Sequence, residues 1–405
     1  MARSPRASVP KSAPGRRVAL HPGREKPVLN RHPWVFSGAI ASVGDDIVDG
    51  DIADVVRSDG EFLARGYVNR RSQIVTRLLT FTDEPIDDAF FTRRLAAAIA
   101  ARSPGPTRLV NAESDGLPGL IVDRYADFAV LQASTLGMDR RKRDLANRIA
   151  GLAGVRGVYD RSDVDGRDKE ALSPETGTLF GDDPPELVAI DEATAAGASI
   201  RVWVDVKRGH KTGTYLDQSE NRKIVGRASN GGEVLNLFSF AGSFSLHAVA
   251  AGATSVVNVD SSADALALSE RNANENGFSD RIEHVRADAF DALRRFRDEG
   301  RTFDGVVLDP PKFAHSSGQV DRAARAYKDL NRVALALVRP TGFLATFSCS
   351  GLVSTDLFQK IVFSASVEAK RDAQIVRRLT QAPDHPVLLS FPEGEYLKGL
   401  LLRVE

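Results

Sequence analysis

The C-terminal part of the chain, from Glu233 onward, alternates apolar runs with stretches that have the period of an α-helix. Such alternation is typical of an α/β fold built on a doubly wound parallel sheet. The carboxyl ends of its strands form one edge, and ligands bind in the crevice there. Each polar residue that stands out follows a predicted strand, so we expect these residues to meet at that edge. The predicted strands are 234–238, 255–259, a third that ends before Asp288, 303–308 and 343–348.

The first predicted strand leads into a tight turn through Phe238, Ser239 and Gly242, and the second closes on Asp260. This arrangement resembles a nucleotide-binding βαβ unit, whose acidic side chain accepts hydrogen bonds from ribose hydroxyls. A dinucleotide site needs three glycines in this turn, which has one, so the pattern favours S-adenosylmethionine over NAD. Asp288 would then lie near the adenine. The alternatives are a structural turn at Gly242 and helix caps at both aspartates.

The fourth predicted strand ends at Asp309-Pro310-Pro311-Lys312-Phe313. Consecutive prolines stiffen the turn and remove two backbone donors, which leaves the backbone open to a planar group. This predicts the base-binding loop of a methyltransferase. Asp309 would border the cofactor and hydrogen-bond the edge of a cytosine, Phe313 would stack on the base, and Lys312 is a further candidate for contact with RNA. A purely structural turn is the alternative.

Cys349 is the only cysteine in 405 residues and follows the fifth predicted strand. A lone thiol excludes an internal disulfide and a cysteine-based zinc site. Since small residues follow it at the end of a strand, it is a candidate nucleophile. The alternative is a buried small apolar residue, a common role of free cysteine. The Asp309 loop and the Gly242 turn in the same unit favour the nucleophile.

The first 80 residues carry 13 Lys or Arg against 8 Asp or Glu, although the whole chain has a net charge of zero. Alternating segments between residues 18 and 79 predict a small β-rich barrel, and its basic excess suits phosphates. Arg31 and Trp34 are candidates for contact with RNA, as is Lys211 in a basic, glycine-containing linker. The alternatives are a solvated basic surface, an interdomain linker, and burial of Trp34 in the core.

These patterns predict four parts: a flexible basic leader over residues 1–16, a β-rich unit over 17–80, a small α+β unit over 81–206 and the α/β unit over 207–405. No His, Cys, Asp or Glu cluster has metal-ligand spacing, so we expect no metal. Neither a secretion signal nor an apolar run long enough to span a membrane occurs. We therefore expect a cytoplasmic protein without a membrane partner.

Further motifs extend from the N-terminal unit to the end of the chain: Arg31-His32-Pro33-Trp34-Val35-Phe36, Gly66-Tyr67-Val68-Asn69, 113–125, Arg161-Ser162-Asp163-Val164, Tyr327-Lys328-Asp329-Leu330-Asn331, 347–352, Phe358-Gln359-Lys360 and 384–399. Together with the Asp309 loop, they resemble the PUA-domain family of large-subunit rRNA cytosine-5 methyltransferases. The resemblance covers nearly the whole chain except the leader.

The resemblance implies an N-terminal RNA-binding PUA domain, a central α+β domain and a Rossmann-like class I methyltransferase domain that uses S-adenosylmethionine. It also implies that Cys349 is the catalytic thiol. Carbon 5 of cytosine is weakly nucleophilic, so a thiolate adds to carbon 6 and pushes electron density onto carbon 5. Asp309 would stabilise the charge that develops. Many RNA cytosine-5 methyltransferases carry a second cysteine after the proline of this loop, where the present chain has Lys312.

Two other functions stay open at this point. A methyltransferase that modifies a purine, or another position of rRNA, would use the same fold without needing the thiol. An RNA-binding protein with an inactive enzyme domain would need neither Cys349 nor Asp309. We expect large-subunit rRNA as the partner, and a homodimer remains an open alternative to a monomer.

Overall fold

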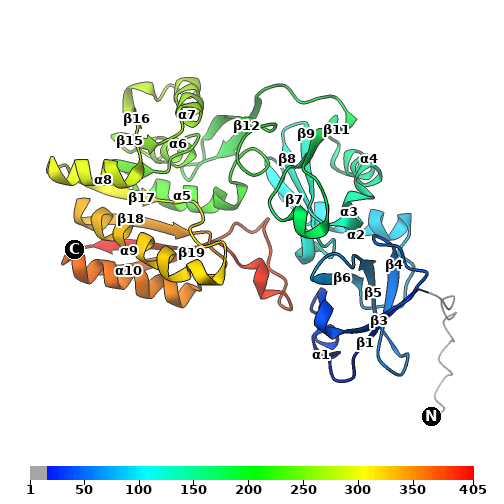
Figure 1. Ribbon diagram of the computed structural model, residues 1–405. Coiled ribbons are helices and arrows are strands. Elements are labelled where there is room, and N and C mark those ends of the chain that lie inside the picture. Colours follow the sequence, from blue (N-terminus) through cyan, green and yellow to red (C-terminus); the bar gives the residue numbers. More distant parts are fainter. Residues whose placement is uncertain (1–15) are drawn as a thin grey trace, which may run out of the picture.

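A computed structural model of the protein describes residues 16–405, and the predicted leader lies outside this part except for Arg16. Figure 1 shows the C-terminal α/β unit on one side and two smaller units on the other. No helix within residues 16–405 is long and apolar enough to cross a membrane. The α/β class and the N-terminal β-rich unit are both confirmed.

The N-terminal unit is a six-stranded sheet with the strand order β2-β6-β5-β4-β1-β3. Gly66 permits the close approach of β5 and β6, because a Cβ there would lie 2.0 Å from the carbonyl oxygen of Arg77. A short helix α1 (Lys26–Leu29) precedes β2. The strands are β1 (Arg17–Leu20), β2 (Trp34–Phe36), β3 (Ile40–Val43), β4 (Ile52–Val56), β5 (Phe62–Val68) and β6 (Ile74–Thr80).

The central unit is a five-stranded sheet with the order β11-β10-β9-β8-β7, packed against α2 and α4. Its core continues into the N-terminal unit through Tyr67, whose hydroxyl donates to the carbonyl oxygen of Pro118 at 2.7 Å. The elements are α2 (Asp88–Ala100), β7 (Thr107–Asn111), β8 (Leu120–Tyr125), β9 (Phe128–Ala133), α3 (Leu136–Asp139), α4 (Lys142–Ala153), β10 (Gly157–Ser162) and β11 (Glu175–Gly181).

A two-stranded hairpin, β12 (Val188–Ala193) and β13 (Ser199–Val204), follows the central unit in the chain but packs on the C-terminal one. Its apolar residues share a core with strands of the large sheet. Glu192 on β12 is buried and forms an ion pair with Arg222, at 2.9 Å, and a contact with His247 at 3.0 Å. The hairpin is therefore fixed to two helices of the C-terminal unit.

The C-terminal unit is a seven-stranded sheet with the order β16-β15-β14-β17-β18-β20-β19. The first five strands are parallel, and β20 runs antiparallel to both of its neighbours. Chain order reverses between β14 and β17, which is where such sheets form a ligand crevice. Its strands are β14 (Glu233–Leu237), β15 (Ser255–Asp260), β16 (Ile282–Arg286), β17 (Phe303–Leu308), β18 (Val338–Ser348), β19 (Ala373–Thr380) and β20 (Lys398–Val404).

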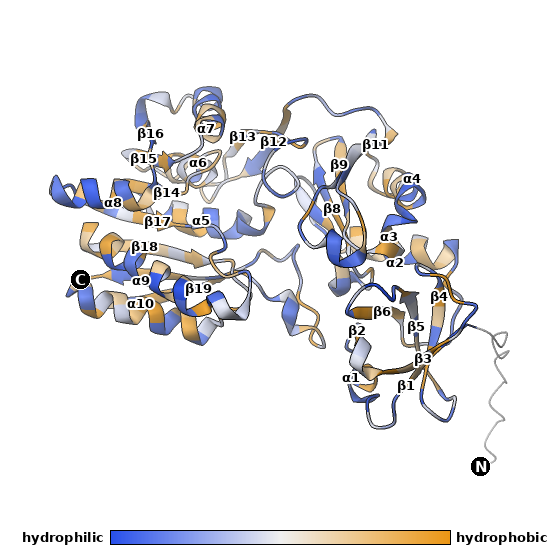
Figure 2. Ribbon diagram, viewed as in Figure 1, coloured by the Kyte–Doolittle hydropathy of each residue, from blue (hydrophilic) through white to orange (hydrophobic). Residues whose placement is uncertain are grey.

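Helices cover both faces of this sheet and bury its apolar strands. Figure 2 shows β17 as largely hydrophobic, and the apolar residues of α8, such as Phe296, join the same core. The helices are α5 (Ser219–Ala228), α6 (Ser243–Ala250), α7 (Ala263–Glu275), α8 (Ala289–Asp298), α9 (Val320–Leu337) and α10 (Thr355–Ala369). The five predicted strands are present at their predicted positions, within one residue except for an earlier start of β18.

A long loop between β19 and β20 leaves the C-terminal unit and reaches the other two, as the red segment of Figure 1 shows. On the central unit, the Asp384 carboxylate accepts from the Arg108 amide at 2.9 Å. On the N-terminal unit, Phe391 packs on Trp34 with ring centroids 4.6 Å apart. The loop thus joins the C-terminal unit to both of the other units.

Candidate functional site

The turn after β14 is shaped by three residues with positive φ: Phe238 at 59°, Phe240 at 47° and Gly242 at 79°. Such angles are costly for residues other than glycine and cluster at functional sites. Gly242 is also required by packing, because a Cβ there would lie 2.2 Å from the Ser269 Oγ. The amide of Phe240 donates to Asp260 Oδ2 at 2.9 Å, so the end of β15 holds the turn in place.

The same turn fits an adenosine-containing cofactor. Among residues 16–405, Asp260 Oδ1 accepts only the Ser262 amide, at 2.9 Å, and carboxylate oxygens have further lone pairs for ribose hydroxyls. Ser239 Oγ is buried and has no hydrogen-bond partner within residues 16–405. Asp260, Ser239 and the backbone from Phe238 to Gly242 are the groups that would hold the cofactor.

The hydrogen bonds of Asp288 do not involve Asp260 or Ser239. Its side chain is exposed and accepts the amides of Phe290 at 2.8 Å and Asp291 at 3.3 Å. It is thus the N-cap of α8, as the structural alternative for this residue predicts. A contact with the adenine stays a prediction.

Asp309 follows β17, and Gln218 Nε2 donates to its Oδ2 at 2.9 Å. Burial, together with the nearby Asp217, raises the pKa of Asp309 to about 7, while the bond from Gln218 opposes this shift. Gln218 is itself oriented, because its Oε1 accepts from Asn221 Nδ2 at 2.6 Å. Asp309 therefore changes protonation near neutral pH, which is where a group that exchanges a hydrogen bond with a base is most useful.

The loop after Asp309 is tied to the segment that carries the thiol. The amides of Phe313 and Ala314 lie 3.3 and 3.4 Å from Ser350 Oγ. The Phe313 ring is half-buried and packs on Tyr327 at 4.8 Å, whereas Lys312 is exposed. Stacking of a base on Phe313 and contact of RNA with Lys312 stay predictions.

Cys349 follows β18 at the same edge of the sheet and is half-buried. Burial and the neighbouring Asp309 raise the pKa of its thiol to about 11, and the charge of Lys211 opposes this. The thiol and the Asp309 carboxyl therefore share one electrostatic environment. Because the thiolate is the reactive form, a nucleophilic role requires nearby groups that favour it.

Lys211, predicted as an RNA contact, is held inside this site. Its Nζ lies 2.5 Å from Asp217 Oδ2, and also 4.8 Å from the ring centroid of Tyr215 and 5.5 Å from that of Tyr396. Asp217 is buried and accepts the Tyr396 hydroxyl at 2.7 Å as well. Burial opposes ionisation of Asp217, but Lys211, with His385, holds the pKa of Asp217 below its usual range. Contact of Lys211 with RNA stays a prediction.

Sequence patterns alone did not single out Tyr215, which lies in the same glycine-containing linker as Lys211. Burial raises the pKa of its phenol, and the anionic charges of Asp309, Cys349 and Asp260 add to the shift. His210 stacks on Phe240 with centroids 4.5 Å apart, and its Nδ1 lies 3.0 Å from the Tyr215 hydroxyl. Tyr215 thus packs on Phe240 of the cofactor turn, with ring centroids 5.6 Å apart, and also feels the charge of the thiol.

The candidate RNA contacts of the N-terminal unit differ in their surroundings. Arg31 is exposed, has a φ of 61°, and lies over the ring of Phe81 at 5.6 Å. The Trp34 indole is half-buried, and its Nε1 donates to Glu113 Oε1 at 2.8 Å. Trp34 therefore joins the units through Glu113 and Phe391, and a contact with RNA stays a prediction for both residues.

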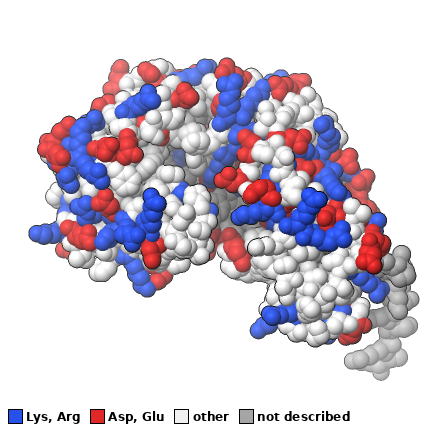
Figure 3. Space-filling model, viewed as in Figure 1, with Lys and Arg blue, Asp and Glu red and all other residues white. Residues whose placement is uncertain are grey.

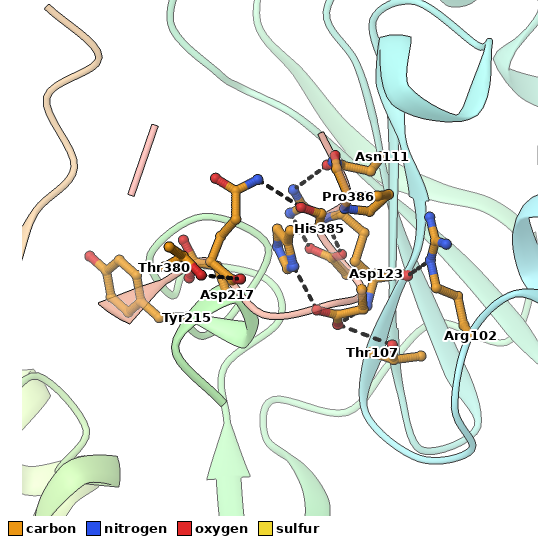
Figure 4. Close-up of polar contacts among 12 residues, drawn as sticks. Arg102, Thr107, Asn111, Asp123, Tyr215, Asp217, Thr380, His385 and Pro386 are labelled. Carbon is orange, nitrogen blue, oxygen red and sulfur yellow. Dashed lines mark hydrogen bonds and ion pairs between the residues drawn. The ribbon is translucent and has the colours of Figure 1, made fainter. Parts of the chain in front are cut away.

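The loop between β19 and β20 connects the site to the central unit. Figure 4 shows His385 and Pro386 between Asp217 on one side and Asn111 and Thr107 of β7 on the other. Asn111 Nδ2 donates to the Pro386 carbonyl oxygen at 2.9 Å, and the Ala382 amide donates to the Asp217 carbonyl oxygen at 2.9 Å. Asp217 is therefore linked to a neighbouring unit by a short chain of hydrogen bonds.

Within residues 16–405, no group of three or more His, Cys, Asp or Glu side chains could hold a metal ion. The polar groups at the edge of the sheet instead form a set with one thiol, two neighbouring carboxyls and a tyrosine. Such a set can provide a nucleophile and a hydrogen-bonding group for a planar substrate beside an adenosine pocket.

Comparison with known proteins agrees with this geometry. Residues 18–81 match a PUA-like domain, and residues 183–403 match the S-adenosylmethionine-dependent methyltransferase family. The ribosomal RNA large subunit methyltransferase I of Shewanella amazonensis is 48% identical over 397 residues, which are 96% of this chain and 99% of the relative.

Solved structures share the fold. A protein from Streptococcus mutans described as a SAM-dependent methyltransferase has a TM-score of 0.80 at 21% identity, over 96% of this chain and 99% of its own. A methyltransferase complexed with SAH has a TM-score of 0.81 at 21% identity, over the same shares of the two chains. The chain belongs to the S-adenosylmethionine-dependent methyltransferases, in the family of ribosomal RNA large subunit methyltransferase I.

Proposed function

We propose that the protein methylates carbon 5 of a cytosine in large-subunit ribosomal RNA, with Cys349 as the nucleophile. The name of the curated relatives supports large-subunit ribosomal RNA as the substrate. Such a substrate is consistent with action in the cytoplasm. The choice of carbon 5 rests on one observation: the sole thiol of the chain lies beside Asp309 at the ligand edge of the sheet. A ring nitrogen is already nucleophilic and needs no thiol, whereas carbon 5 of cytosine does.

S-adenosylmethionine, when bound, supplies an electrophilic methyl group. The turn from Phe238 to Gly242, with Ser239 and Asp260, would hold its adenosine part. Tyr215, between Asp260 and Cys349, would separate that pocket from the cytosine, and the stacked pair of His210 and Phe240 would shield it from water. Exclusion of water strengthens the electrostatic interactions in such a site.

The Cys349 sulfur would attack carbon 6 of the cytosine ring, and the electron pair of the carbon 5–carbon 6 double bond would move toward carbon 5 and the ring nitrogen at position 3. Asp309 in its protonated form would donate a hydrogen bond to that nitrogen and so stabilise the charge. The pKa of Asp309, raised to about 7 by burial, keeps a useful fraction protonated at neutral pH. After methylation, a base accepts the proton from carbon 5, the electron pair of that bond re-forms the carbon 5–carbon 6 double bond, and the thiolate leaves carbon 6 with the electron pair of the carbon–sulfur bond.

The N-terminal unit would bind the RNA backbone. Several of its arginines already have acidic partners, for example Arg65 with Asp54 and Arg77 with Glu170. Arg24, Lys26 and Arg31 are exposed, and no ion pair engages them in the part of the chain that the structure describes. Unpaired basic side chains are the ones free to neutralise phosphates. Arg24 also lines an apolar cavity of about 220 Å³, together with Trp34 and Phe36.

Figure 3 shows basic and acidic side chains interspersed over the visible face, without a large field of one sign. Affinity for RNA would therefore come from a small number of unpaired cations and from stacking rather than from net charge, which is zero. Binding of this kind depends on the shape of the RNA and on unpaired bases.

The test is nucleoside mass spectrometry of large-subunit rRNA from a strain that lacks the enzyme, incubated with purified protein and isotopically labelled S-adenosylmethionine. Label in 5-methylcytidine supports the proposal. Label in a purine nucleoside, or on an exocyclic nitrogen of cytidine, would replace it with the purine or other-position reaction on the same fold. Binding of RNA without any label would favour the non-catalytic alternative.

A further inference from the structure

Lys398 is a buried lysine that the proposed reaction has not yet used. It begins β20 and pairs across the sheet with Ser348, the residue before Cys349. Lys398 is only 5% exposed. Within residues 16–405 no carboxylate forms an ion pair with it, and Glu395 acts on it only through space. A buried ammonium group without a carboxylate partner is unusual, because burial strongly disfavours an isolated charge.

The Lys398 ammonium group holds the turn that follows the thiol. Its Nζ donates to the carbonyl oxygens of Ser350 and Val353, both at 2.7 Å. The Val353 amide also donates to the Ser350 carbonyl oxygen, at 3.0 Å, so residues 350–353, directly after Cys349, form one turn. The side chain of Ser350 meets the Asp309 loop on the other side. The backbone at Cys349 is therefore fixed from two directions.

Other charged and titratable groups also act on the ionisation of the Cys349 thiol. Asp309 and Asp217 face it from their loops and disfavour the thiolate, and Tyr215 and Tyr327 act on it as neutral phenols. Lys211 favours the thiolate, and Asp217, which is paired with it at 2.5 Å, acts on the thiol in the opposite direction. Lys398 interacts with the charge of the Cys349 thiolate, and among the described residues no carboxylate forms an ion pair with it.

We propose that Lys398 is a positioning residue for the Cys349 thiol: its ammonium group fixes the turn after the thiol and favours the thiolate over the thiol. This inference rests on the proposed function, because a thiolate is needed only if Cys349 is the nucleophile. In this role Lys398 acts through the backbone and the electric field at the sulfur.

The test uses the fact that Cys349 is the only cysteine, so alkylation of the full chain by iodoacetamide reports on this thiol alone. Rates are measured from neutral to strongly alkaline pH for the wild type and for Lys398→Gln, without RNA or cofactor, and circular dichroism checks the fold at each pH. Lys360→Gln is the matched control, since Lys360 is an exposed lysine of α10 in the same unit.

We expect alkylation of Lys398→Gln to be slower than that of the wild type by about tenfold at pH values where Lys398 is charged. The two rates should converge as pH rises through the pKa of Lys398, which burial lowers from its ordinary value. Convergence is expected because the wild-type lysine then loses its charge too. Lys360→Gln should follow the wild type at every pH.

A rate ratio that is the same at all pH values, whether above or below one, would overturn the proposal, because it would show a change in access to the sulfur and not in its ionisation. If Lys398→Gln does not fold, Lys398→Met, which leaves no donor unpaired, gives the same comparison. Activity of Cys349→Ala would reject the proposed nucleophile but would leave the alkylation result unchanged, so the two claims fail separately.

Discussion

Gln218 donates a hydrogen bond of 2.9 Å to the carboxylate of Asp309, while Asn221 fixes the other end of the same amide group. One Asp309 oxygen is thereby committed to the protein, and the proposed reaction uses the other to contact the cytosine. Since burial raises the pKa of Asp309 to about 7, the protonation state of this residue changes within the working pH range of an enzyme.

The first prediction concerns the pH dependence of kcat/KM. The active form needs a protonated Asp309 and an ionised Cys349, whose pKa values are about 7 and about 11. Below about pH 7 each rise in pH increases the thiolate fraction while Asp309 stays protonated, so log kcat/KM should rise with a slope of one. Above about pH 7 the loss of the Asp309 proton offsets this gain, and the profile should become level.

Asp309→Asn removes the group that titrates near pH 7. We expect a lower rate in which log kcat/KM keeps rising past pH 7 toward the pKa of the thiol, because an amide donates at every pH. Asp356→Asn, at an exposed residue of α10, is the control and should keep the break in slope. A break near pH 7 that persists in Asp309→Asn would contradict the assignment of this titration to Asp309.

The second prediction concerns the buried pair of Asp217 and Lys211, which are 2.5 Å apart. Asp217→Asn should lower the free energy of unfolding by about 1–3 kcal/mol at neutral pH, less than for a fully buried pair because Lys211 is partly exposed. Lys211 holds the pKa of Asp217 below the ordinary 3.8, so this stability is present above that value and is lost as pH falls through the folded-state pKa.

Urea unfolding of the wild type and Asp217→Asn at several pH values checks the second prediction. The difference between the two should be constant near neutrality and should shrink in acid. Lys360→Gln, which breaks an exposed pair with Asp356 in α10, should change stability by less than about 0.5 kcal/mol. If Asp217→Asn lowers the free energy of unfolding equally at neutral and acid pH, the charge of the Asp217 carboxylate is not the cause of the lost stability.

The third prediction concerns the packing of Phe391 on Trp34, with centroids 4.6 Å apart. Phe391 is 6% exposed, so Phe391→Ala should loosen the docking of the loop on the N-terminal unit by about 1–3 kcal/mol. Hydrogen exchange in β2 and in the loop should become faster. Leu389→Ala is a matched control in the same loop because Leu389 is fully exposed. If protection from hydrogen exchange is unchanged in both variants, the contact between Phe391 and Trp34 does not hold the loop.

The positions of the strands and of the polar residues that follow them could be predicted from the sequence, because strands and helices alternate regularly and parallel strands end at one edge. The strands β19 and β20 were not predicted. β19 is an edge strand that exposes most of its residues, including Arg377 and Arg378, and so it lacks the apolar run that marks a buried strand.

Partners that are distant in the sequence could not be predicted. Gln218 contacts Asp309, and Phe391 contacts Trp34, but neither pair has a local pattern that indicates the other member. For the same reason the central unit was expected to extend to residue 206, although the hairpin of β12 and β13 packs on the C-terminal unit and the methyltransferase match begins at residue 183. We therefore propose a domain boundary before the hairpin.

The fourth prediction concerns RNA binding by Arg31, which is exposed and has no ion-pair partner among the described residues. Arg31→Ala should weaken rRNA binding and reduce the slope of log K against log salt by about 1, as expected for one lost phosphate contact. Arg57→Ala is the control, because Glu61 already engages that guanidinium at 3.2 Å. An unchanged salt slope in Arg31→Ala would remove Arg31 from the RNA interface.

The central claim is that Cys349 attacks the cytosine ring, and the most direct measurement compares wild type and Cys349→Ala on large-subunit rRNA with labelled S-adenosylmethionine. Binding of the cofactor and of RNA is measured in both proteins to show that the variant is intact. The account predicts labelled 5-methylcytidine from the wild type and none from Cys349→Ala at equal binding. Formation of 5-methylcytidine by Cys349→Ala at the wild-type rate would contradict it.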